Sequence, residues 1–284
     1  MGIDLHSIRL IQDLAAQRPL GDVLTIGRQS VDFDASALGD PPADPVEAQY
    51  CEWVLRALGA GTVASLDISD YEGATHIGDL GTPMVLSRTY DTVIDAGSLE
   101  HVFDVATAFR NLIAFTAVSG QIVHVLPVNN LSGHGFWQFS SDLIYALYSA
   151  ANGFADTRVY YASSINQGEW RLVPPPQAGT RTELVSLEPV ILLSVTTKQR
   201  EVGALRVVQP FYDQAWSEGA EVLVSHPPSR SSWLRALMTR RTWAHRLARN
   251  AYTIAGLAFG TSRYALRGKR FARRSPEAAR DGKP

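Results

Sequence analysis

Short apolar runs that suit β-strands alternate with helix-like segments over the first half of the chain, and this alternation most limits the possible folds. The strand-like runs span residues 22–27, 62–69, 74–80, 90–97 and 121–128. Apolar residues at helical spacing fill residues 45–61 and 102–118 between them. Because parallel strands need a crossover between them, usually a helix, the alternation predicts a doubly wound, mostly parallel α/β sheet.

The strands expected in the second half are connected differently. A helix is predicted over residues 140–153, followed by strands over 153–162 and 190–198. Three consecutive prolines at 174–176 lie between these strands, and they do not suit a helical crossover. We therefore expect the two strands to form an antiparallel pair at the edge of the sheet.

Charge is divided unevenly along the chain, although the net charge is only −2. From His226 onward there are fourteen Lys and Arg but only two acids, Glu277 and Asp281, which leaves twelve basic and twenty-six acidic residues before it. The end of the chain is therefore strongly basic and the rest strongly acidic. Pro227 and Pro228 mark the predicted boundary between a domain at 1–225 and a basic extension at 226–284.

The basic extension is predicted to contain an amphipathic helix over residues 231–259 and to end in a disordered segment over 268–284. Cationic and apolar faces on one helix suit peripheral contact with an anionic membrane through residues 229–260. Docking on the acidic body, or on another copy of the chain, are the alternatives. Nucleic-acid binding is not expected, because no recognition fold accompanies the charge.

Cysteine content and hydropathy indicate the compartment. The single cysteine, Cys51, excludes a disulfide framework and a cysteine-based zinc cluster. No run approaches eighteen apolar residues, and the N-terminus resembles an amphipathic helix rather than a signal peptide. A cytoplasmic location is therefore expected.

The loop after the first expected strand is unusual for a nucleotide site. The strand ends at Gly27, but Arg28, Gln29 and Ser30 follow where a dinucleotide or adenosyl site usually continues as Gly-x-Gly. The loop is therefore either not such a site or a rebuilt one.

Residues 90–147 carry a family resemblance. A strand ending in Asp95 runs into Leu-Glu-His at 99–101 and then into a helix with Arg-Asn-Leu at 110–112. This segment resembles the S-adenosylmethionine-dependent methyltransferases of the methyltransferase-11 type. The stretches DYEGATHIGDL and HGFWQFS are similar to a bacterial subgroup associated with glycan and surface-polysaccharide gene clusters.

The resemblance covers roughly residues 20 to 200 and implies a fold, a cofactor and an activity. The implied fold is a Rossmann-like methyltransferase sheet, mostly parallel with an antiparallel edge strand, to which the basic helical C-terminal extension is added. The implied cofactor is S-adenosyl-L-methionine. The implied activity is methyl transfer to an oxygen or nitrogen of a small polar acceptor, related to a sugar or glycan in polysaccharide biosynthesis.

The resemblance also assigns cofactor-binding residues. It implies that Asp67 accepts hydrogen bonds from the ribose hydroxyls and that Asp79 meets the adenine amino group; both acids also suit turns. The motif Asp95, Ala96, Gly97 is implied to lie beside the methionine part of the cofactor, and Gly27 is expected among the cofactor-binding residues.

Arg28 is the sharpest of these predictions. The subgroup carries Gly-Arg-Gln at this place, and a guanidinium can pair through two hydrogen bonds with a carboxylate. We therefore predict that Arg28 binds the methionyl carboxylate of the cofactor.

Two polar clusters are candidates for acceptor chemistry. Glu100 and His101 follow the fourth strand, and His101 is a candidate proton acceptor or an orienting residue. The loop at 129–140 holds His134, a rival base, among amides and aromatic rings. We expect the acceptor to meet Glu100, Asn129, Asn130, Trp137 and Gln138; the alternative is that the aromatic residues only plug the end of the sheet.

Residues that the sequence lacks bear on three further possibilities. No His-x-His or His-Glu-x-x-His spacing is present, so no metal is expected. A methyltransferase-like protein without catalysis is the main rival, because Gly-x-Gly is missing. A nicotinamide-dependent sugar enzyme is disfavoured, because Gly-x-x-Gly and a Tyr-x-x-x-Lys pair are missing too.

Overall fold

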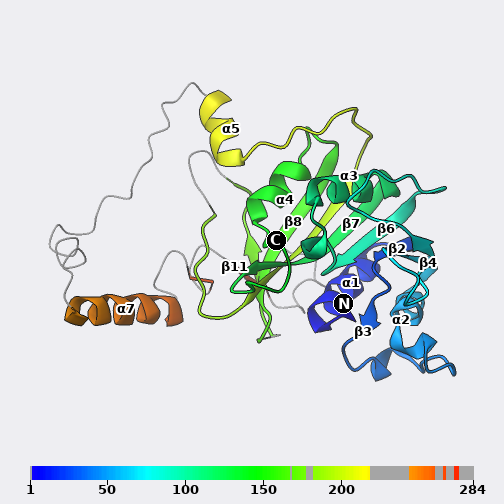
Figure 1. Ribbon diagram of the computed structural model, residues 1–284, viewed down its shortest axis with the longest axis horizontal. Coiled ribbons are helices and arrows are strands. Elements are labelled where there is room, and N and C mark those ends of the chain that lie inside the picture. Colours follow the sequence, from blue (N-terminus) through cyan, green and yellow to red (C-terminus); the bar gives the residue numbers. More distant parts are fainter. Residues whose placement is uncertain are drawn as a thin grey trace.

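The computed structural model describes residues 2–166, 168–176, 182–217, 243–259, 265–266 and 272–274. Over these residues the fold is an α/β sheet with helices on both faces (Figure 1). In spatial order, the strands of the main sheet are β11 (Ala272–Arg274), β9 (Trp170–Val173), β8 (Phe154–Ser163), β10 (Val190–Lys198), β7 (Thr116–Asn129), β6 (Tyr90–Ala96), β2 (Gly21–Ile26), β4 (Ala60–Asp67) and β5 (His76–Ile77). The two short strands β1 (Gly2–Ile3) and β3 (Ser30–Val31) form a separate parallel pair.

The half of the sheet that contains β5, β4, β2, β6 and β7 is parallel, as the alternating pattern predicts. From β2 the chain crosses to β4 on one side, and it later returns to β6 on the other side. The strand order therefore reverses between β2 and β6. In open α/β sheets, ligands bind beyond the carboxyl ends of the strands at such a switch point.

Helices cover the two faces and bury two separate apolar cores. The helices α3 (Val105–Phe115) and α4 (Ser141–Leu147) pack on one face, where Leu24, Leu66 and Phe109 belong to one core. The helices α1 (Leu5–Gln17) and α2 (Glu52–Ala57) pack on the other, with Val23 and Ile94 in the second core. Neighbouring residues of a strand point to opposite faces of the sheet. Because helices cover both faces, the central strands are apolar at successive positions instead of alternating with polar residues.

The antiparallel edge is confirmed, but it is larger than expected. β10 lies between β7 and β8 and is antiparallel to both of them. Strands β9 and β11 then continue the sheet, each antiparallel to its neighbour. Neither was predicted, because β9 follows a loop next to the proline run and β11 lies in a segment whose composition suggested disorder. The prediction of disorder is therefore wrong for residues 272–274.

The prediction of a single helix over residues 45–61 is mostly wrong. Only α2 is α-helical there, and a 3₁₀ turn at Glu47–Gln49 precedes it. Tyr50 between the two is extended and forms an isolated bridge with Ser30. Its ring lies under the Arg28 guanidinium, 4.1 Å from the ring centroid. Tertiary contacts with the loop after β2 therefore interrupt the helical pattern.

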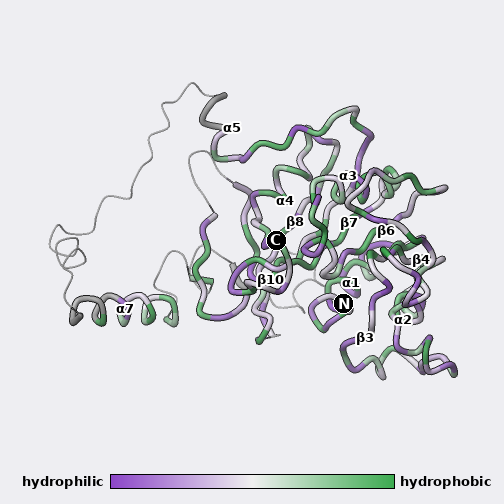
Figure 2. Tube along the Cα trace, in the orientation of Figure 1, coloured by the Kyte–Doolittle hydropathy of each residue, from purple (hydrophilic) through white to green (hydrophobic). Residues whose placement is uncertain are grey.

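The basic extension is only partly described. Its described helix is α7 (Trp243–Ala258), in which hydrophobic and hydrophilic residues interleave (Figure 2). Leu247, Tyr252 and Ile254 are exposed. Leu266, by contrast, is buried in the first core. The part of the predicted helix before Trp243 lies outside the described residues. No helix among the described ranges is long and apolar enough to span a bilayer.

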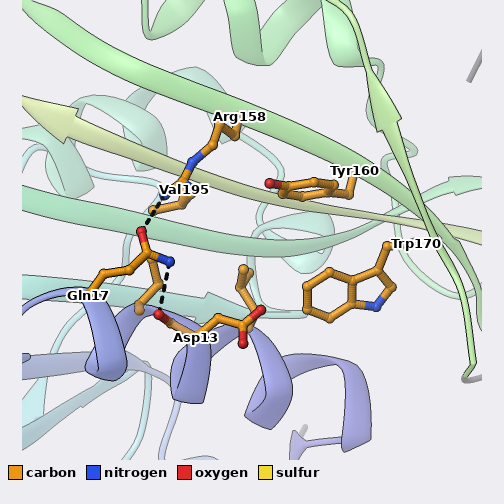
Figure 3. A pocket seen from close by; sticks show the side chains of 8 residues that line it. Asp13, Gln17, Arg158, Tyr160, Trp170 and Val195 are labelled. Atoms are coloured by element: carbon orange, nitrogen blue, oxygen red, sulfur yellow. Dashed lines mark hydrogen bonds between the residues drawn. The ribbon is translucent and has the colours of Figure 1, made fainter. Parts of the chain in front are cut away.

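Helix α1 is fixed to the antiparallel edge by a buried histidine. Trp170 Nε1 donates to His6 Nδ1 at 2.9 Å, and His6 Nε2 lies 3.0 Å from the Ser163 carbonyl oxygen. A neutral ring serves both contacts, because one nitrogen accepts and the other donates. Nearby, α1 packs on β8, β9 and β10 with little space left, and Figure 3 shows the ring of Trp170 beside it. The cavity there is about 10 Å³, room for roughly one water molecule.

Stability is expected to fall below about pH 6.5 because of His6. Burial lowers the pKa of His6 below its usual 6.5, so the unfolded chain takes up a proton before the folded protein does. This contribution is full above pH 6.5 and is lost as the pH falls through the folded pKa. Glutamine can replace the hydrogen bond of Nε2 without titrating. We expect urea unfolding of His6→Gln to depend less on pH between about 5 and 6.5 than unfolding of the unaltered protein. Equal slopes for both proteins would contradict this prediction.

Candidate active site

A cavity of about 140 Å³ opens at the carboxyl ends of β2 and β4, at the switch point of the sheet. Gly27 directly follows β2 with a φ of +75°, and its backbone N–H donates to the Leu66 carbonyl. The lining residues from these strands and the following loops are Ile26, Gly27, Leu66, Asp67, Ile68, Gly78, Asp79, Leu80, Ser98, His101 and Val102. Three of the predicted cofactor residues, Gly27, Asp67 and Asp79, therefore face one cavity.

Asp67 and Asp79 each support a turn as well as lining the cavity. Asp67 Oδ1 accepts from the backbone N–H of Ile68 at 2.7 Å, and Asp79 Oδ1 accepts from that of Gly81, also at 2.7 Å. Each of these bonds uses one carboxylate oxygen. A carboxylate has a second oxygen, so a turn-forming role and a ligand role are compatible for both residues.

The loop after β2 is closed by Gln29, which the sequence analysis did not assign. Gln29 is buried, and its side-chain amide donates to the Ile26 carbonyl and to Ser98 Oγ. Ser98 Oγ in turn donates to the same carbonyl at 2.7 Å. These bonds join the ends of β2 and β6 at the switch point. The only signal in the sequence for this role is a polar residue directly after Gly-Arg.

Arg28 does not face the cavity as predicted, because this chain's own carboxylates hold it. Its Nε donates to Glu52 at 2.7 Å, and Nη2 donates to both oxygens of Glu47 at 2.9 Å. Nη1 donates to the Glu72 carbonyl oxygen at 2.8 Å. Arg28 thus makes two hydrogen bonds to one carboxylate, but both come from Nη2 and the partner is Glu47. A cofactor carboxylate could bind Arg28 only if Glu47 moved away.

Asp95 is also placed differently from the prediction. Its side chain is fully buried and turned into the protein, where Oδ2 accepts from His124 Nδ1 at 2.8 Å. Oδ1 accepts from the backbone N–H groups of Ser98 and Leu99. His124 Nε2 lies 2.6 Å from the hydroxyl of buried Tyr148. Asp95 therefore fixes the turn after β6 rather than contacting a ligand, since its carboxylate has no exposed surface.

Ala96 and Gly97 complete this strand end. Ala96 is buried at the last position of β6. Gly97 has a φ of +86°, and a Cβ there would lie 3.3 Å from Glu100 Oε1. The glycine is thus required by the backbone and leaves space beside Glu100. Neither residue lines the cavity.

Glu100, His101 and His134 form a cluster, of which His101 lines the cavity. Glu100 Oε1 lies 3.5 Å from His134 Nε2 and 4.0 Å from His101 Nε2. Glu100 is buried, whereas both imidazoles are partly exposed. Burial and then the charge of Asp95 raise the pKa of Glu100 to about 8. Burial and then His134 lower the pKa of His101. The structure therefore brings both candidate bases to one carboxyl group.

The loop at 129–140 lies over this cluster. The backbone N–H groups of Phe136 and Trp137 donate to the Glu100 carbonyl, and Trp137 Nε1 donates to the Val102 carbonyl at 2.9 Å. The edge of the Phe136 ring packs against Phe103, and both rings are exposed. This part of the loop therefore presents aromatic surface next to His101 and His134.

The three amide residues of the loop have structural contacts. The Asn130 side chain donates to the carbonyls of Ser186 and Glu188, and Asn129 Oδ1 accepts from the Asn130 backbone. Gln138 Oε1 accepts from the Leu131 backbone at 3.2 Å. These bonds shape the loop. Contact of the three residues with an acceptor stays a prediction.

Comparison with known proteins shows likeness in fold only. No family model and no curated protein matches the sequence. The N-methyltransferase NodS from Bradyrhizobium japonicum WM9 is similar in structure, with 13% identity over 69% of this chain and 94% of that chain and a TM-score of 0.41. TehB from Haemophilus influenzae has 12% identity over 67% and 61%, with a TM-score of 0.41. A Burkholderia thailandensis 1,6-didemethyltoxoflavin-N1-methyltransferase, crystallised with S-adenosylhomocysteine, has 15% identity over 69% and 78%, with a TM-score of 0.39. Any function assigned to this chain therefore rests on its own site.

Proposed function

We propose that the chain binds S-adenosyl-L-methionine at the switch point and transfers its methyl group to a small polar acceptor. One observation carries the proposal: a cavity at the carboxyl ends of β2 and β4 is lined by the carboxylate of Asp67, at the end of β4, and by His101, whose ring lies close to Glu100 and His134. The residues fit an adenosyl ligand, because Gly27 allows close backbone approach and Asp67 can accept from two hydroxyl groups.

The position of each side chain suggests its role in the proposed reaction. The cofactor, when bound, supplies a methyl group on a sulfonium, and the electron pair of the broken bond stays on sulfur. Asp67 and Asp79 hold the adenosine end, and the buried contacts of Gln29 and Ser98 keep the strand ends in position. In the cluster, Glu100, His101 and His134 promote loss of the acceptor proton, either as bases or through a bound cation.

Asp67→Ala is expected to weaken binding of S-adenosylhomocysteine about 100-fold. Each hydrogen bond to a charged group is worth about 1.5–3 kcal/mol, and about 1.4 kcal/mol is tenfold in affinity. Isothermal titration calorimetry measures the change. Asp70→Ala is the matched control, because Asp70 is an exposed acid in the same loop but does not line the cavity.

Three outcomes of this titration are informative. Absence of binding to the unaltered protein at millimolar concentration would overturn the proposed function. Tighter binding of NAD than of S-adenosylhomocysteine would favour a nicotinamide enzyme. Equal dissociation constants for Asp67→Ala and Asp70→Ala would remove the ribose role of Asp67 alone.

The acceptor class is the finer part of the proposal. Phe103, Phe136 and Trp137 are exposed beside His101 and His134, and aromatic faces of this kind suit a sugar ring or another flat molecule. We propose a glycan-related acceptor on this ground. Screening of sugars and nucleotide sugars for S-adenosylhomocysteine release tests it. A chain that binds the cofactor but methylates no acceptor would favour the non-catalytic alternative.

Peripheral membrane contact through residues 229–260 is proposed separately. The exposed apolar side chains on α7, among them Leu247, Tyr252 and Ile254, support it. Flotation with anionic vesicles tests this contact, on the unaltered protein and on a protein without residues 229–260, which retains Leu266 and β11. Equal partitioning of the two proteins would remove it.

A further inference from the structure

We infer that Glu100, His101 and His134 bind one divalent transition-metal ion, such as Zn²⁺, next to the cavity. The inference rests on the proposed function only for the use made of the ion, not for its binding. The absence of a known metal-binding spacing had argued against a metal. Glu100 and His101 are adjacent in sequence, but the loop at 129–140 brings His134 to them from the end of the next strand.

The three ligand atoms are already gathered. One carboxylate oxygen of Glu100 and one ring nitrogen of each histidine all lie within 4.8 Å of one another. Bond lengths of about 2.0–2.1 Å in a tetrahedral site put ligand atoms about 3.3 Å apart. The 3.5 Å separation of Glu100 Oε1 and His134 Nε2 is close to that value. The 4.0 Å separation from His101 Nε2 requires only a small movement.

The surroundings let the side chain of His134 adjust to an ion and hold its loop against Glu100. His134 lies between Gly133 and Gly135, and its side chain is half exposed. A Cβ at Gly135 would come within 2.7–2.9 Å of Glu100, so only glycine lets the loop approach the acid this closely. The loop is attached by the two backbone donors to the Glu100 carbonyl. The histidine can therefore close on an ion without loss of the loop.

The contacts of Glu100 leave one of its oxygens unused. Its Oε2 is buried and has no hydrogen-bond partner among the described residues, and its Oε1 lies near two histidines that carry a charge only when protonated. Asp95 is a second buried acid nearby, so a negative charge on Glu100 is repelled by it. A bound cation would compensate this buried carboxylate, which otherwise costs stability.

The donor set indicates the class of ion. Two imidazoles and one carboxylate suit Zn²⁺, Co²⁺, Mn²⁺ or Fe²⁺ rather than Mg²⁺ or Ca²⁺, which prefer oxygen ligands. Three protein ligands also leave positions for an acceptor, as in catalytic zinc sites. An acceptor hydroxyl bound there would release its proton to water at lower pH, and the resulting oxygen would form the new bond to the methyl carbon. His101 and His134 then act as ligands rather than as bases.

Co²⁺ titration of the metal-stripped full-length protein tests the inference, because a bound cobalt ion absorbs in the visible range. We expect one equivalent to bind the unaltered protein and Ser132→Ala, the control for an exposed residue of the same loop. Glu100→Gln, His101→Ala and His134→Ala should each weaken binding by more than about 100-fold, since even outer partners of a metal ligand cost about 10–100-fold when removed. His134 is exposed, so His134→Ala should fold even if Glu100→Gln does not.

The possible failures are distinguishable. No saturable one-to-one binding, or unchanged affinity in His134→Ala, would overturn the metal site. Titration with S-adenosylhomocysteine runs in parallel, and we expect His134→Ala to bind it as the unaltered protein does. A chain that binds S-adenosylhomocysteine but not Co²⁺ refutes the metal site alone. A chain that binds Co²⁺ but not S-adenosylhomocysteine refutes the proposed function alone.

Discussion

Replacing Asp95 by alanine is expected to lower the free energy of unfolding by about 4 kcal/mol, because each buried group left without its partner costs about 1–3 kcal/mol. The carboxylate serves three donors at once: His124 Nδ1 and the backbone N–H groups of Ser98 and Leu99. All of these groups are buried. Urea unfolding followed by tryptophan fluorescence measures the change.

A comparison of Asp95→Ala with Tyr148→Phe separates the effect on stability from the effect on the geometry of the site. Tyr148→Phe removes only the outer member of the chain and should cost about 1–2 kcal/mol, since the His124 ring keeps its bond to Asp95. Asp95→Ala also frees the turn that carries Glu100 and His101, so folded Asp95→Ala should bind Co²⁺ more weakly than Tyr148→Phe. Equal stability of Asp95→Ala and the unaltered protein would show that the carboxylate is not needed in the core.

Most of the sheet was predictable because its strands are short apolar runs that end at glycine or polar residues. The order of polar residues at the strand ends also predicted the site in part, since carboxyl ends of parallel strands converge at one edge. Gly27, Asp67 and Asp79 line the cavity for this reason. His101 lines it too, because the turn after β6 lies at the same edge.

The wrong predictions have a common cause. The pattern of apolar residues predicts helices and strands, but it does not specify where a polar side chain at the end of an element points. Asp95 ends a strand as a ligand-binding acid would, but an alternating strand places its side chain toward His124. Glu47 and Glu52 lie in the segment that the pattern predicts as one helix, yet both reach back to Arg28. The pairing of β9 with β11 joins segments about a hundred residues apart and has no local signal.

Replacing Arg28 by alanine is expected to cost about 3–5 kcal/mol, the typical loss when one partner of a buried ion pair is removed. Arg28 and Glu52 are nearly buried, and Glu52 Oε2 already lacks a partner. Arg28→Lys should recover only part of the loss, because an ammonium cannot serve Glu47, Glu52 and the Glu72 carbonyl in one plane. The guanidinium also lies over Tyr50.

A double-mutant cycle assigns this stability to the ion pair. Glu52→Gln combined with Arg28→Ala should show a coupling energy of about 1–3 kcal/mol, whereas Arg56→Ala, an exposed arginine on α2, should change stability by less than about 0.5 kcal/mol. The cofactor role predicted from the sequence would instead require that changes at Arg28 weaken cofactor binding. If Arg28→Lys kept its stability but bound S-adenosylhomocysteine at least tenfold more weakly, Glu47 would have to release Arg28 on binding. The ion pair with Glu47 would then occupy Arg28 until the cofactor binds, in addition to stabilising the loop.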